Sequence, residues 1–251
     1  MGRSVLLLVN RAKPGADDAE ARVSALIRTH GTLVDALEAM CDDTPRDCAD
    51  VDLIVVLGGD GTLMTAAGRY ASCGRPILGV NIGRVGFMAG FDLGSLEHHA
   101  PAVFGGGALD TRPASMLRAE IIDEQGASTG ALSAINDFAI TAGPPYRVIE
   151  LAIRINGSVG PVVRGDGIIV STAVGSTAYN VSAGWPIVHP LVDTTIITPI
   201  AAHSLAFRPM GVAGTSAIEI SDSQTNTESG SGTTLVLDGQ IQRRITSHER
   251  V

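Results

Sequence analysis

Short apolar runs alternate with longer amphipathic segments along the first hundred residues of the chain. Residues 17–29 place Val23, Leu26 and Ile27 on one face of a helix, and a second apolar helical pattern begins after Thr62. Four runs rich in leucine, valine and isoleucine predict buried strands, at 4–10, 33–37, 52–57 and 76–81. Strands that alternate with helices in this way predict a parallel sheet covered by helices.

The pattern changes after a glycine- and proline-containing stretch that ends at Pro113. Apolar residues then recur at every second position, most clearly over 149–155, as a sheet with one buried face requires. Further strands are predicted at 116–123, 134–141, 167–171, 217–221 and 234–237. One helix is convincing in this part, Ser176–Ala183. The pattern therefore predicts an α/β domain, residues 1–108, followed by a larger β-rich domain, residues 109–251.

Composition narrows the classes of function. The formal net charge of −8 argues against broad, non-specific binding to nucleic acid. No segment approaches the roughly eighteen uninterrupted apolar residues of a membrane span, and the apolar run at 5–9 is too short for a signal peptide. Cys41, Cys48 and Cys73 are scattered and odd in number, which does not suggest a disulfide framework or a zinc site. We therefore expect a cytoplasmic protein with no membrane contact.

Several familiar nucleotide-binding and catalytic designs are absent from the sequence. Lys13 is the only lysine, so neither a P-loop nor the strand lysine of a protein kinase is present. The chain also lacks the Gly-x-Gly-x-x-Gly of dehydrogenases and the Gly-x-Ser-x-Gly of hydrolases. A polyanionic ligand must therefore be held by local N–H donors, arginines or a divalent cation.

The most informative segment is Gly58-Gly59-Asp60-Gly61-Thr62, which follows a predicted buried strand. In open α/β sheets, ligands bind at this end of the strands. Glycines let main-chain N–H groups approach a phosphate closely, and a following helix aims its N-terminus at the same place. Asp60 would add a proton acceptor or a metal ligand. The alternative is a tight turn in which Asp60 bonds its own backbone.

Further motifs follow in a fixed order along the chain. They are Asn81–Phe87, Asn136-Asp137, Arg164–Gly167 with Ser171-Thr172 and Gly175–Tyr179, Pro199-Ile200, His203–Leu205, Arg208-Pro209 and Asp238–Gln240. Together with Gly58–Thr62 they resemble the NAD kinases, which phosphorylate the adenosine ribose 2′-hydroxyl of NAD. Diacylglycerol kinases, sphingosine kinases and phosphofructokinases share the first motif alone. The resemblance extends over roughly residues 4–242.

The resemblance implies a Rossmann-like α/β domain followed by a β-sandwich, with ATP or polyphosphate as phosphate donor and Mg²⁺ as the divalent cation. It implies that small-molecule nucleotides are the ligands and that the chain forms a homodimer or homotetramer. Asp60 would be the general base. NAD contacts are implied at Asp60, Gly61, Phe87, Asn136, Asp137, Arg147, Arg164, Asp166, Thr177, Ala178, Tyr179, Ser182 and Gln240. Contacts to the donor phosphates are implied at Gly58, Gly59, Gly61 and Thr62.

Some of these residues also have simpler interpretations. Phe87 would present a flat face to a base, or it is an ordinary core phenylalanine. Asn136 and Asp137 interrupt an apolar strand, where polar side chains need partners, either the ligand or the backbone of a strand-end turn. His189 and His203 fit no metal-ligand spacing and are interpreted as structural, so no metal-binding residue is assigned.

Arg164 and Asp166 point to the same side if their segment is extended, which suits an ion pair that is either structural or in contact with the ligand. Asp238–Gln240 is typical of a hairpin turn, and Gln240 is a ligand contact by resemblance alone. Arg147 lies where the family carries a basic residue that reaches a neighbouring subunit's site.

The sequence also departs from the family's pattern. Trp185 replaces a glycine beside the expected nicotinamide region, Ala173-Val174 replaces a proline and a hydroxyl residue, and few residues follow Gln240. The predicted function is therefore NAD kinase, with two alternatives. One is a non-catalytic NAD- or NADP-binding relative. The other is a diacylglycerol-type lipid kinase, which Asn136-Asp137 and the 164–179 segment disfavour.

Overall fold

The computed structural model describes residues 2–41, 43–83, 88–144, 146–203, 207–222, 232–239 and 241–251. The chain forms two compact units, residues 1–112 and residues 113–251. Each unit has a hydrophobic core of its own. None of the described helices is both long and apolar enough to cross a membrane.

The first unit is a parallel five-stranded sheet in the order β2-β1-β3-β4-β5. Its strands are β1 (Ser4–Val9), β2 (Thr32–Glu38), β3 (Leu53–Gly58), β4 (Ile77–Asn81) and β5 (Phe91–Asp92), and its helices are α1 (Ala16–His30), α2 (Asp60–Tyr70), the short 3₁₀ helix η1 (Ala71–Cys73) and α3 (Leu93–Phe104). The four predicted strands and two predicted helices are confirmed.

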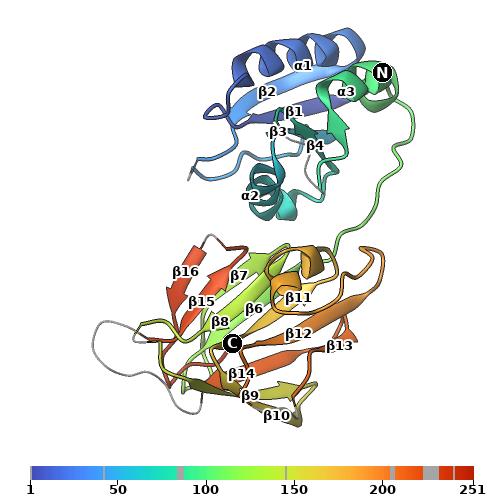
Figure 1. The fold of residues 1–251 in the computed structure, drawn as a ribbon. Helices are drawn as coiled ribbons and strands as arrows, with labels where there is room; N and C mark the ends of the chain where they lie inside the picture. Colours follow the sequence, from blue (N-terminus) through green and yellow to red (C-terminus); the bar gives the residue numbers. More distant parts are fainter. Residues whose placement is uncertain are drawn as a thin grey trace. The chain divides into compact units, whose positions relative to one another are not determined.

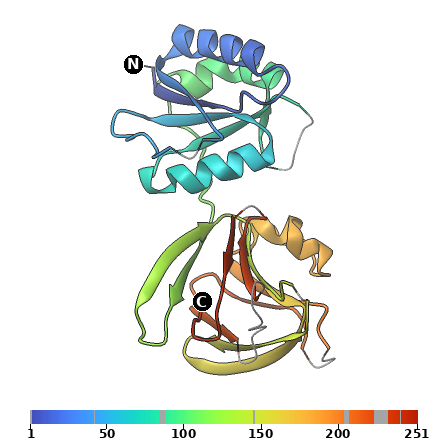
Figure 2. The ribbon, with the colours of Figure 1, turned by 90° about the vertical axis from the view of Figure 1, so that its left-hand side faces the viewer.

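Helices cover both faces of this sheet because its inner strands carry apolar side chains on both faces. Val5 and Leu7 of β1 pack with α1 and α3, whereas Leu6 and Leu8 pack on the opposite side with α2. Figures 1 and 2 show α1 and α3 on one side of the sheet and α2 on the other. The parallel, helix-covered sheet expected from the sequence is therefore confirmed.

Helix α3 and strand β5 were not predicted. The helix begins with a capping box, in which the Asp92 carboxylate accepts a hydrogen bond from the Ser95 amide (2.7 Å) and the Asp92 amide donates to the Ser95 hydroxyl (3.0 Å). Leu96, Ala100 and Phe104 then face the core. Their spacing is the signal that the sequence contained for this helix.

The second unit is antiparallel and rich in strands. Its sheets have the orders β13-β12-β11-β8-β15-β16, β10-β9-β14 and β6-β7. The strands are β6 (Leu117–Ile122), β7 (Ser128–Ala134), β8 (Asp137–Thr141), β9 (Ile149–Ile155), β10 (Ser158–Gly165), β11 (Gly167–Thr172), β12 (Thr194–Ile200), β13 (Met210–Ala213), β14 (Ile218–Asp222), β15 (Thr234–Leu237) and β16 (Ile241–Arg244).

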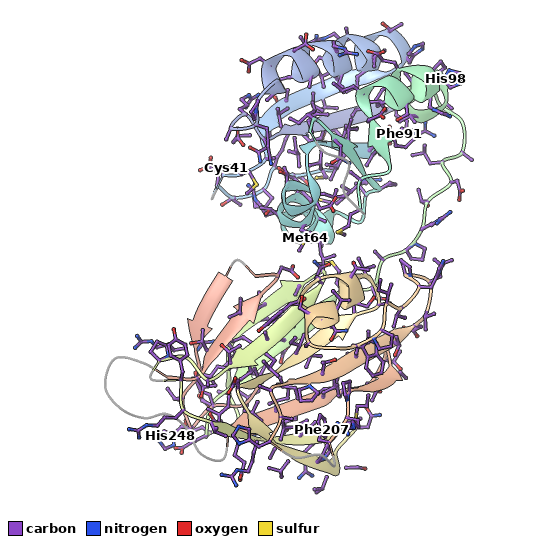
Figure 3. The ribbon with its side chains drawn as sticks, viewed as in Figure 1. Cys41, Met64, Phe91, His98, Phe207 and His248 are labelled. Carbon is purple, nitrogen blue, oxygen red and sulfur yellow. The ribbon has the colours of Figure 1, made fainter. Side chains whose placement is uncertain are left out.

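The core of the second unit lies between two layers of sheet. Leu151 and Ile153 of β9 pack in one cluster with Phe138 of β8 and Ile168 of β11. Phe207, labelled in Figure 3, belongs to the same cluster. The β-rich sandwich that the sequence led us to expect is therefore confirmed.

Two local predictions were wrong in this unit. The strand expected over 134–141 is interrupted at Ile135 and Asn136, so that β7 ends at Ala134 and β8 begins at Asp137. The helix expected over Ser176–Ala183 is instead a 3₁₀ helix, η2 (Val174–Thr177), followed by one turn of α-helix, α4 (Tyr179–Ser182). Ala178 separates them with φ −93° and ψ −131°, which no helix accommodates.

The cysteines are free thiols, yet two of them meet although they lie far apart in the sequence. The Cys48 Sγ lies 2.6 Å from the Cys73 Sγ. Burial, followed by the neighbouring Cys73, raises the pKa of the Cys48 thiol to about 12. Cys41 accepts a hydrogen bond from the Arg69 guanidinium at 3.4 Å.

Candidate active site

The Gly58–Thr62 motif joins a strand to a helix and is not an isolated turn. Strand β3 ends at Gly58, Gly59 is extended (φ −128°, ψ −172°), and α2 begins at Asp60. A Cβ on Gly58 would lie 2.5 Å from the Thr62 Oγ1, so only glycine allows the helix to pack this closely on the strand. The motif therefore fixes Asp60 in the first turn of a helix at the carboxyl end of the sheet.

The N-terminus of α2 presents backbone donors beside this carboxylate. The first hydrogen bond at the start of the helix runs from the Leu63 amide to the Gly59 carbonyl, at 3.0 Å. The amides of Asp60, Gly61 and Thr62 precede it and have no acceptor within the helix. Such a group of N–H donors is suited to binding phosphate. The Asp60 carboxylate itself accepts a hydrogen bond from the Met88 amide at 3.3 Å.

The strand order places this motif at the point where the chain stops adding strands on one side of β1 and begins to add them on the other side. Strands β1 and β3 are neighbours, while the chain continues from β1 outward to β2 and from β3 outward to β4. Ligands of open α/β sheets bind at such a switch point, outside the carboxyl ends of the strands. The residue that follows β1 is Asn10, whose Nδ2 donates to the Thr62 hydroxyl at 2.9 Å.

Two asparagines at this sheet edge carry buried polar atoms that lack a partner within the described residues. They are the Oδ1 of Asn10 and both side-chain amide atoms of Asn81, which ends β4. Asn10 is 8% and Asn81 is 4% exposed. Buried polar atoms are almost always bonded, so these atoms are candidate ligand contacts. Asn10 was not predicted as a site residue, although a polar residue directly after an apolar strand is a usable signal.

In the second unit, Asn136 and Asp137 are held by a carboxylate from a distant turn. The Asp238 carboxylate accepts hydrogen bonds from the amides of Ile135 (2.9 Å), Asn136 (2.7 Å) and Asp137 (3.1 Å). Asp238 has a φ of 46° and forms, with Gly239, the turn between β15 and β16. Asp238–Gly239 is thus a hairpin turn, and its aspartate also fixes the break between β7 and β8.

Asp137 is a buried acid with an altered ionisation. Asp137 is only 4% exposed. Burial, followed by the negative charge of Asp238, raises the pKa of the Asp137 carboxyl from 3.8 to about 6. A carboxylate in such surroundings gains from a ligand that donates hydrogen bonds to it.

These residues line a cavity of about 340 Å³ in the second unit. Its walls include Asn136 and Asp137 from the strand break, Ala178 and Tyr179 from the break between η2 and α4, and Asp238. Tyr179 is 46% exposed, so part of its side chain is open to a ligand. Four of the residues assigned to NAD from the sequence therefore meet at one cavity.

Close backbone packing holds the two sides of this cavity together. A Cβ on Gly175 would lie 2.1 Å from the Asn136 carbonyl oxygen, so the chain at 175 accommodates only glycine. The Thr172 hydroxyl donates to the Ile135 carbonyl (2.7 Å) and accepts from the Gly175 amide (3.0 Å). The Gly-Ser-Thr segment is thereby tied to the strand break.

Other predicted residues are not part of this cavity's lining. Thr177 and Ser182 are exposed on η2 and α4. Asn180, between them, is fully buried, and its amide atoms have no partner in the described part of the chain. The indole Nε1 of Trp185 is also buried and has no hydrogen-bond partner among the described residues. Asn180 was not predicted as a site residue, because nothing in its spacing distinguishes it from a core residue.

Arg164 and Asp166 lie at the opposite end of β11 from Asp137. Asp166 immediately precedes Gly167, which pairs with Thr141, whereas Ser171 pairs with Asp137. The four residue-to-residue steps from Gly167 to Ser171 span about 13 Å along an extended strand. The exposed Arg147, in the segment before β9, belongs to the same end, because Ile149 pairs with Gly165.

Arg164 and Asp166 are both exposed and flank the buried Gly165, as the extended geometry required. The ion pair of Arg164 is nevertheless formed with Glu150 on the paired strand, with 3.4 Å between Nε and Oε2. The expected Arg164–Asp166 pair is therefore wrong, since the cross-strand carboxylate is the nearer partner. Phe87 and Gln240 lie outside the described residues.

The residues at the sheet edge of the first unit and those at the cavity of the second unit suit different chemical tasks. The edge of the first unit offers N–H donors for an anion and a carboxylate for a proton. The cavity of the second unit offers an amide, an acid and an aromatic ring, which suit a nucleoside. No cluster of three or more histidine, cysteine, aspartate or glutamate residues suited to a metal occurs in the described ranges.

Comparison with known families and relatives gives a consistent result. Residues 9–108 match the N-terminal domain of the ATP-NAD kinases, and residues 135–251 match the C-terminal domain of that family. An NAD kinase from Lachnoclostridium phytofermentans is 36% identical over 216 residues, which are 86% of this chain and 75% of that protein.

An NAD kinase from Symbiobacterium thermophilum is 38% identical over 171 residues, which are 68% of this chain. This alignment spans 60% of the relative's own length, less than two thirds of it. The crystal structure of yeast NADH kinase complexed with NADH matches with a TM-score of 0.78 at 22% identity, covering 100% of this chain and 79% of that one. This structural likeness supports the two-unit fold.

Proposed function

Because this chain belongs to the NAD kinase family, we propose that it transfers the terminal phosphate of ATP, or of polyphosphate, to the adenosine ribose 2′-hydroxyl of NAD, giving NADP. The observation that carries this proposal is the Asp60 carboxylate in the first turn of α2, beside three amides that have no acceptor in the helix. The carboxylate would accept a proton, and the neighbouring amides would hold a phosphate.

In this mechanism, the amides of Asp60, Gly61 and Thr62 bind the phosphates of the donor. The Asp60 carboxylate accepts the proton of the 2′-hydroxyl as the hydroxyl oxygen attacks the terminal phosphorus. The bond from that phosphorus to the bridging oxygen of the donor breaks, and ADP or the shortened polyphosphate leaves. The transition state of phosphoryl transfer is loose, so the hydroxyl loses its proton late and a carboxylate is a sufficient base. Such assistance contributes about 10²–10⁴-fold, and positioning and charge neutralisation supply the remainder.

The cavity of the second unit is proposed to bind NAD. The Asn136 side chain and the Asp137 carboxylate would pair with the adenine edge and ribose hydroxyls, and the Tyr179 ring would stack on an apolar face of the dinucleotide. Asp137 is ionised above pH about 6 and then accepts hydrogen bonds from hydroxyl groups. Its burial excludes water that would compete for them.

A divalent cation, Mg²⁺, is proposed to enter as part of the donor complex. Mg²⁺ usually binds one or two carboxylates together with substrate phosphates and keeps several waters. The Asp60 carboxylate in the first turn of α2, beside the amides proposed to hold the donor phosphates, fits this mode. When bound, the cation neutralises charge on the donor phosphates.

Arg147, Arg164 and Asp166 are proposed to serve the site of a neighbouring subunit in a homodimer or homotetramer. Their position at the far end of β11 from Asp137, about 13 Å along the strand, supports this proposal. Size-exclusion chromatography with light scattering tests it, and a monomeric, fully active protein would contradict it. The proposed setting is NADP biosynthesis in the cytoplasm.

A coupled assay tests the function directly. Purified protein is given ATP, Mg²⁺ and NAD, and NADP is detected with a dehydrogenase that accepts only NADP. We expect turnover by the wild type and a loss of about 10²–10⁴-fold in kcat for Asp60→Asn, with NAD binding retained. Asp110→Asn, an exposed acid in the same unit, is the matched control and should be fully active.

The same experiment separates the alternatives. NAD binding without turnover in the wild type would indicate a non-catalytic NAD- or NADP-binding relative. Turnover with lipid hydroxyls and none with NAD would indicate a diacylglycerol-type lipid kinase. Either result would refute the proposal.

A further inference from the structure

Two cysteine thiols of the first unit meet at the edge of its core, and neither has a part in the proposed phosphoryl transfer. Cys48 lies in the connection from β2 to β3, and Cys73 lies in η1, which directly follows α2. Their Sγ atoms are 2.6 Å apart, although 25 residues separate them in the sequence. A disulfide bond brings two sulfurs to about 2.05 Å, so only a small approach would join them.

Contacts that do not involve these two thiols hold the connection from β2 to β3 against the end of α2. The Arg69 guanidinium, in the last turn of α2, donates to the carbonyls of Ala39 (3.1 Å) and Asp43 (2.8 Å). It also donates to the Sγ of Cys41, the cysteine labelled in Figure 3, at 3.4 Å. The fold itself therefore brings the thiol pair together, before any bond joins the two sulfurs.

A cavity of about 440 Å³ gives solutes access to the pair. Cys48 and Cys73 both belong to its lining. Cys48 is only 4% exposed, whereas Cys73 is half-buried. A small molecule that enters the cavity therefore has better access to the Cys73 sulfur than to the Cys48 sulfur.

The two thiols also differ in their role in an exchange reaction. Burial, followed by the hydrogen bond and the charge of Cys73, raises the pKa of Cys48 to about 12, so Cys48 stays a thiol at neutral pH. The thiolate is the nucleophile of thiol–disulfide exchange, so the exchange begins at Cys73. The part of the shift that Cys73 causes disappears once the Cys73 sulfur is bound to another sulfur, because a disulfide carries no charge.

We propose that Cys48 and Cys73 are a reversible redox pair, which a low-molecular-weight disulfide oxidises through the cavity to an intrachain disulfide. In the first step, the Cys73 thiol loses its proton to solvent, its thiolate attacks one sulfur of the small disulfide, and that S–S bond breaks to release one thiolate. In the second step, the Cys48 thiol loses its proton, its sulfur attacks the Cys73 sulfur, and the other half of the small disulfide leaves as a thiolate. The two cysteines are thereby oxidised, and the small disulfide is reduced to two thiols when its thiolates take up protons. A small thiolate that enters the cavity reverses the exchange.

The bond would act on the stability of the first unit. It would connect the segment before β3 to the segment after α2, and a cross-link of this kind stabilises a fold by restricting the unfolded chain. Helix α2 has 11 residues and Asp60 is its first residue, so Asp60 lies about 15 Å from the cross-linked end. Oxidation should therefore stabilise the unit and leave the start of α2 unchanged.

The test treats the full chain, first reduced and then freed of reductant, with oxidised glutathione. Peptide mapping of the product should find two peptides joined through Cys48 and Cys73. The midpoint of thermal unfolding should rise by at least about 5 °C. Dithiothreitol should separate the peptides and return the midpoint to the value of the reduced protein.

Variants made in a Cys41→Ser background assign the steps, because only two thiols then remain. Cys41→Ser alone is the matched control, and it should lose both thiols, bind no glutathione and show the same rise in the midpoint. With Cys48→Ser added, the reaction should stop with one glutathione on Cys73 and no comparable rise. With Cys73→Ser added, the buried Cys48 should take up no glutathione.

Several results would overturn the proposal. They are a wild type that keeps Cys48 and Cys73 unlinked, a linked pair that contains Cys41, and a disulfide between two chains. Glutathione on Cys48 in the variant without Cys73 would refute the order of the steps, and a lower midpoint after oxidation would refute the stabilising bond. None of these measurements depends on phosphoryl transfer, so their failure is distinct from a failure of the proposed function.

Discussion

The two units assemble their candidate residues in opposite ways. In the first unit, a strand, its glycine-rich end and the start of a helix place Asp60 and its neighbouring amides within five consecutive residues. In the second unit, Asp238 reaches amides that lie 101 to 103 residues away in the sequence. One arrangement is local, and the other exists only when the sandwich is complete.

This difference has energetic consequences. A local junction depends on backbone geometry, so changes elsewhere in the chain leave it largely intact. A long-range arrangement depends on each contact that connects its segments, and here these are one glycine, one threonine hydroxyl and one carboxylate. Single substitutions should therefore affect stability and ligand binding together in the second unit and separately in the first.

The largest expected effect is that of Gly175→Ala. The added Cβ would lie 2.1 Å from the Asn136 carbonyl oxygen, and backbone atoms cannot move aside as a flexible side chain does. We expect the free energy of unfolding to fall by about 3 kcal/mol. Urea titration followed by the fluorescence of Trp185, the only tryptophan, reports on this unit.

Gly130→Ala is the control for this prediction. It adds a methyl group in the same unit at an ordinary contact distance of 3.8 Å from the Arg243 side chain. Equal stability of the two variants would mean that the strand break and η2 are not tightly packed, and the contrast between the units would weaken.

The next effect is a pH dependence due to Asp137. Its folded pKa, about 6, exceeds the unfolded value of 3.8, so stability is greatest below pH 4 with respect to this group and falls as pH rises to 6. Asp137→Asn removes this dependence. The unfolding free energy of the variant, relative to that of the wild type, should increase by about 2–3 kcal/mol from pH 4 to pH 7.

Urea titrations at several pH values across this window provide the measurement. Asp193→Asn, at an exposed position of the same unit, is the control for the substitution itself. A difference between Asp137→Asn and the wild type that does not change with pH would place Asp137 in contact with water and contradict the buried geometry.

The local site could be predicted from the sequence because its signals are adjacent residues. An apolar run followed by Gly58–Thr62 determines the strand, the junction and the helix start without information from the rest of the chain. The other site residues were predicted from the order of the motifs along the chain, which resembles that of the NAD kinases. Asn10 was missed because its partner, Thr62, is distant in sequence and near only in the folded sheet.

The second unit was less predictable for the same physical reason. The sequence indicated that Asn136 and Asp137 are polar residues in an apolar strand, but not that Asp238 bonds their amides. It predicted an ion pair between Arg164 and Asp166, whereas the antiparallel register brings Glu150 closer to Arg164. Cross-strand neighbours follow from register, which local patterns determine weakly.

A smaller effect is expected for Asp238→Asn. The amide group accepts through one atom only, so at least one of the amides of Ile135, Asn136 and Asp137 loses its acceptor. We expect a loss of about 1–2 kcal/mol of unfolding free energy. The lost negative charge should also lower the pKa of Asp137, which the Asp238 charge raises.

Both consequences can be measured in one set of urea titrations. The Asp137-dependent loss of stability should move to lower pH in Asp238→Asn, and the KM for NAD should increase. An unchanged pH midpoint together with an unchanged KM would show that Asp238 acts only as a turn residue.

The smallest effect on stability is expected for Asn81→Ala in the first unit, where binding and folding should be separable. Both amide atoms of Asn81 are buried without a partner in the described ranges, so truncation removes no hydrogen bond there and should change stability by less than about 0.5 kcal/mol. If the amide contacts the nucleotide, the KM for ATP should rise severalfold in the coupled assay.

Asn10→Ala is the matched control, because it loses the 2.9 Å bond to Thr62 and should cost about 1 kcal/mol of stability, measured by thermal unfolding. A stability loss in Asn81→Ala as large as that of Asn10→Ala, with KM unchanged, would assign Asn81 to the fold and remove it from the candidate site.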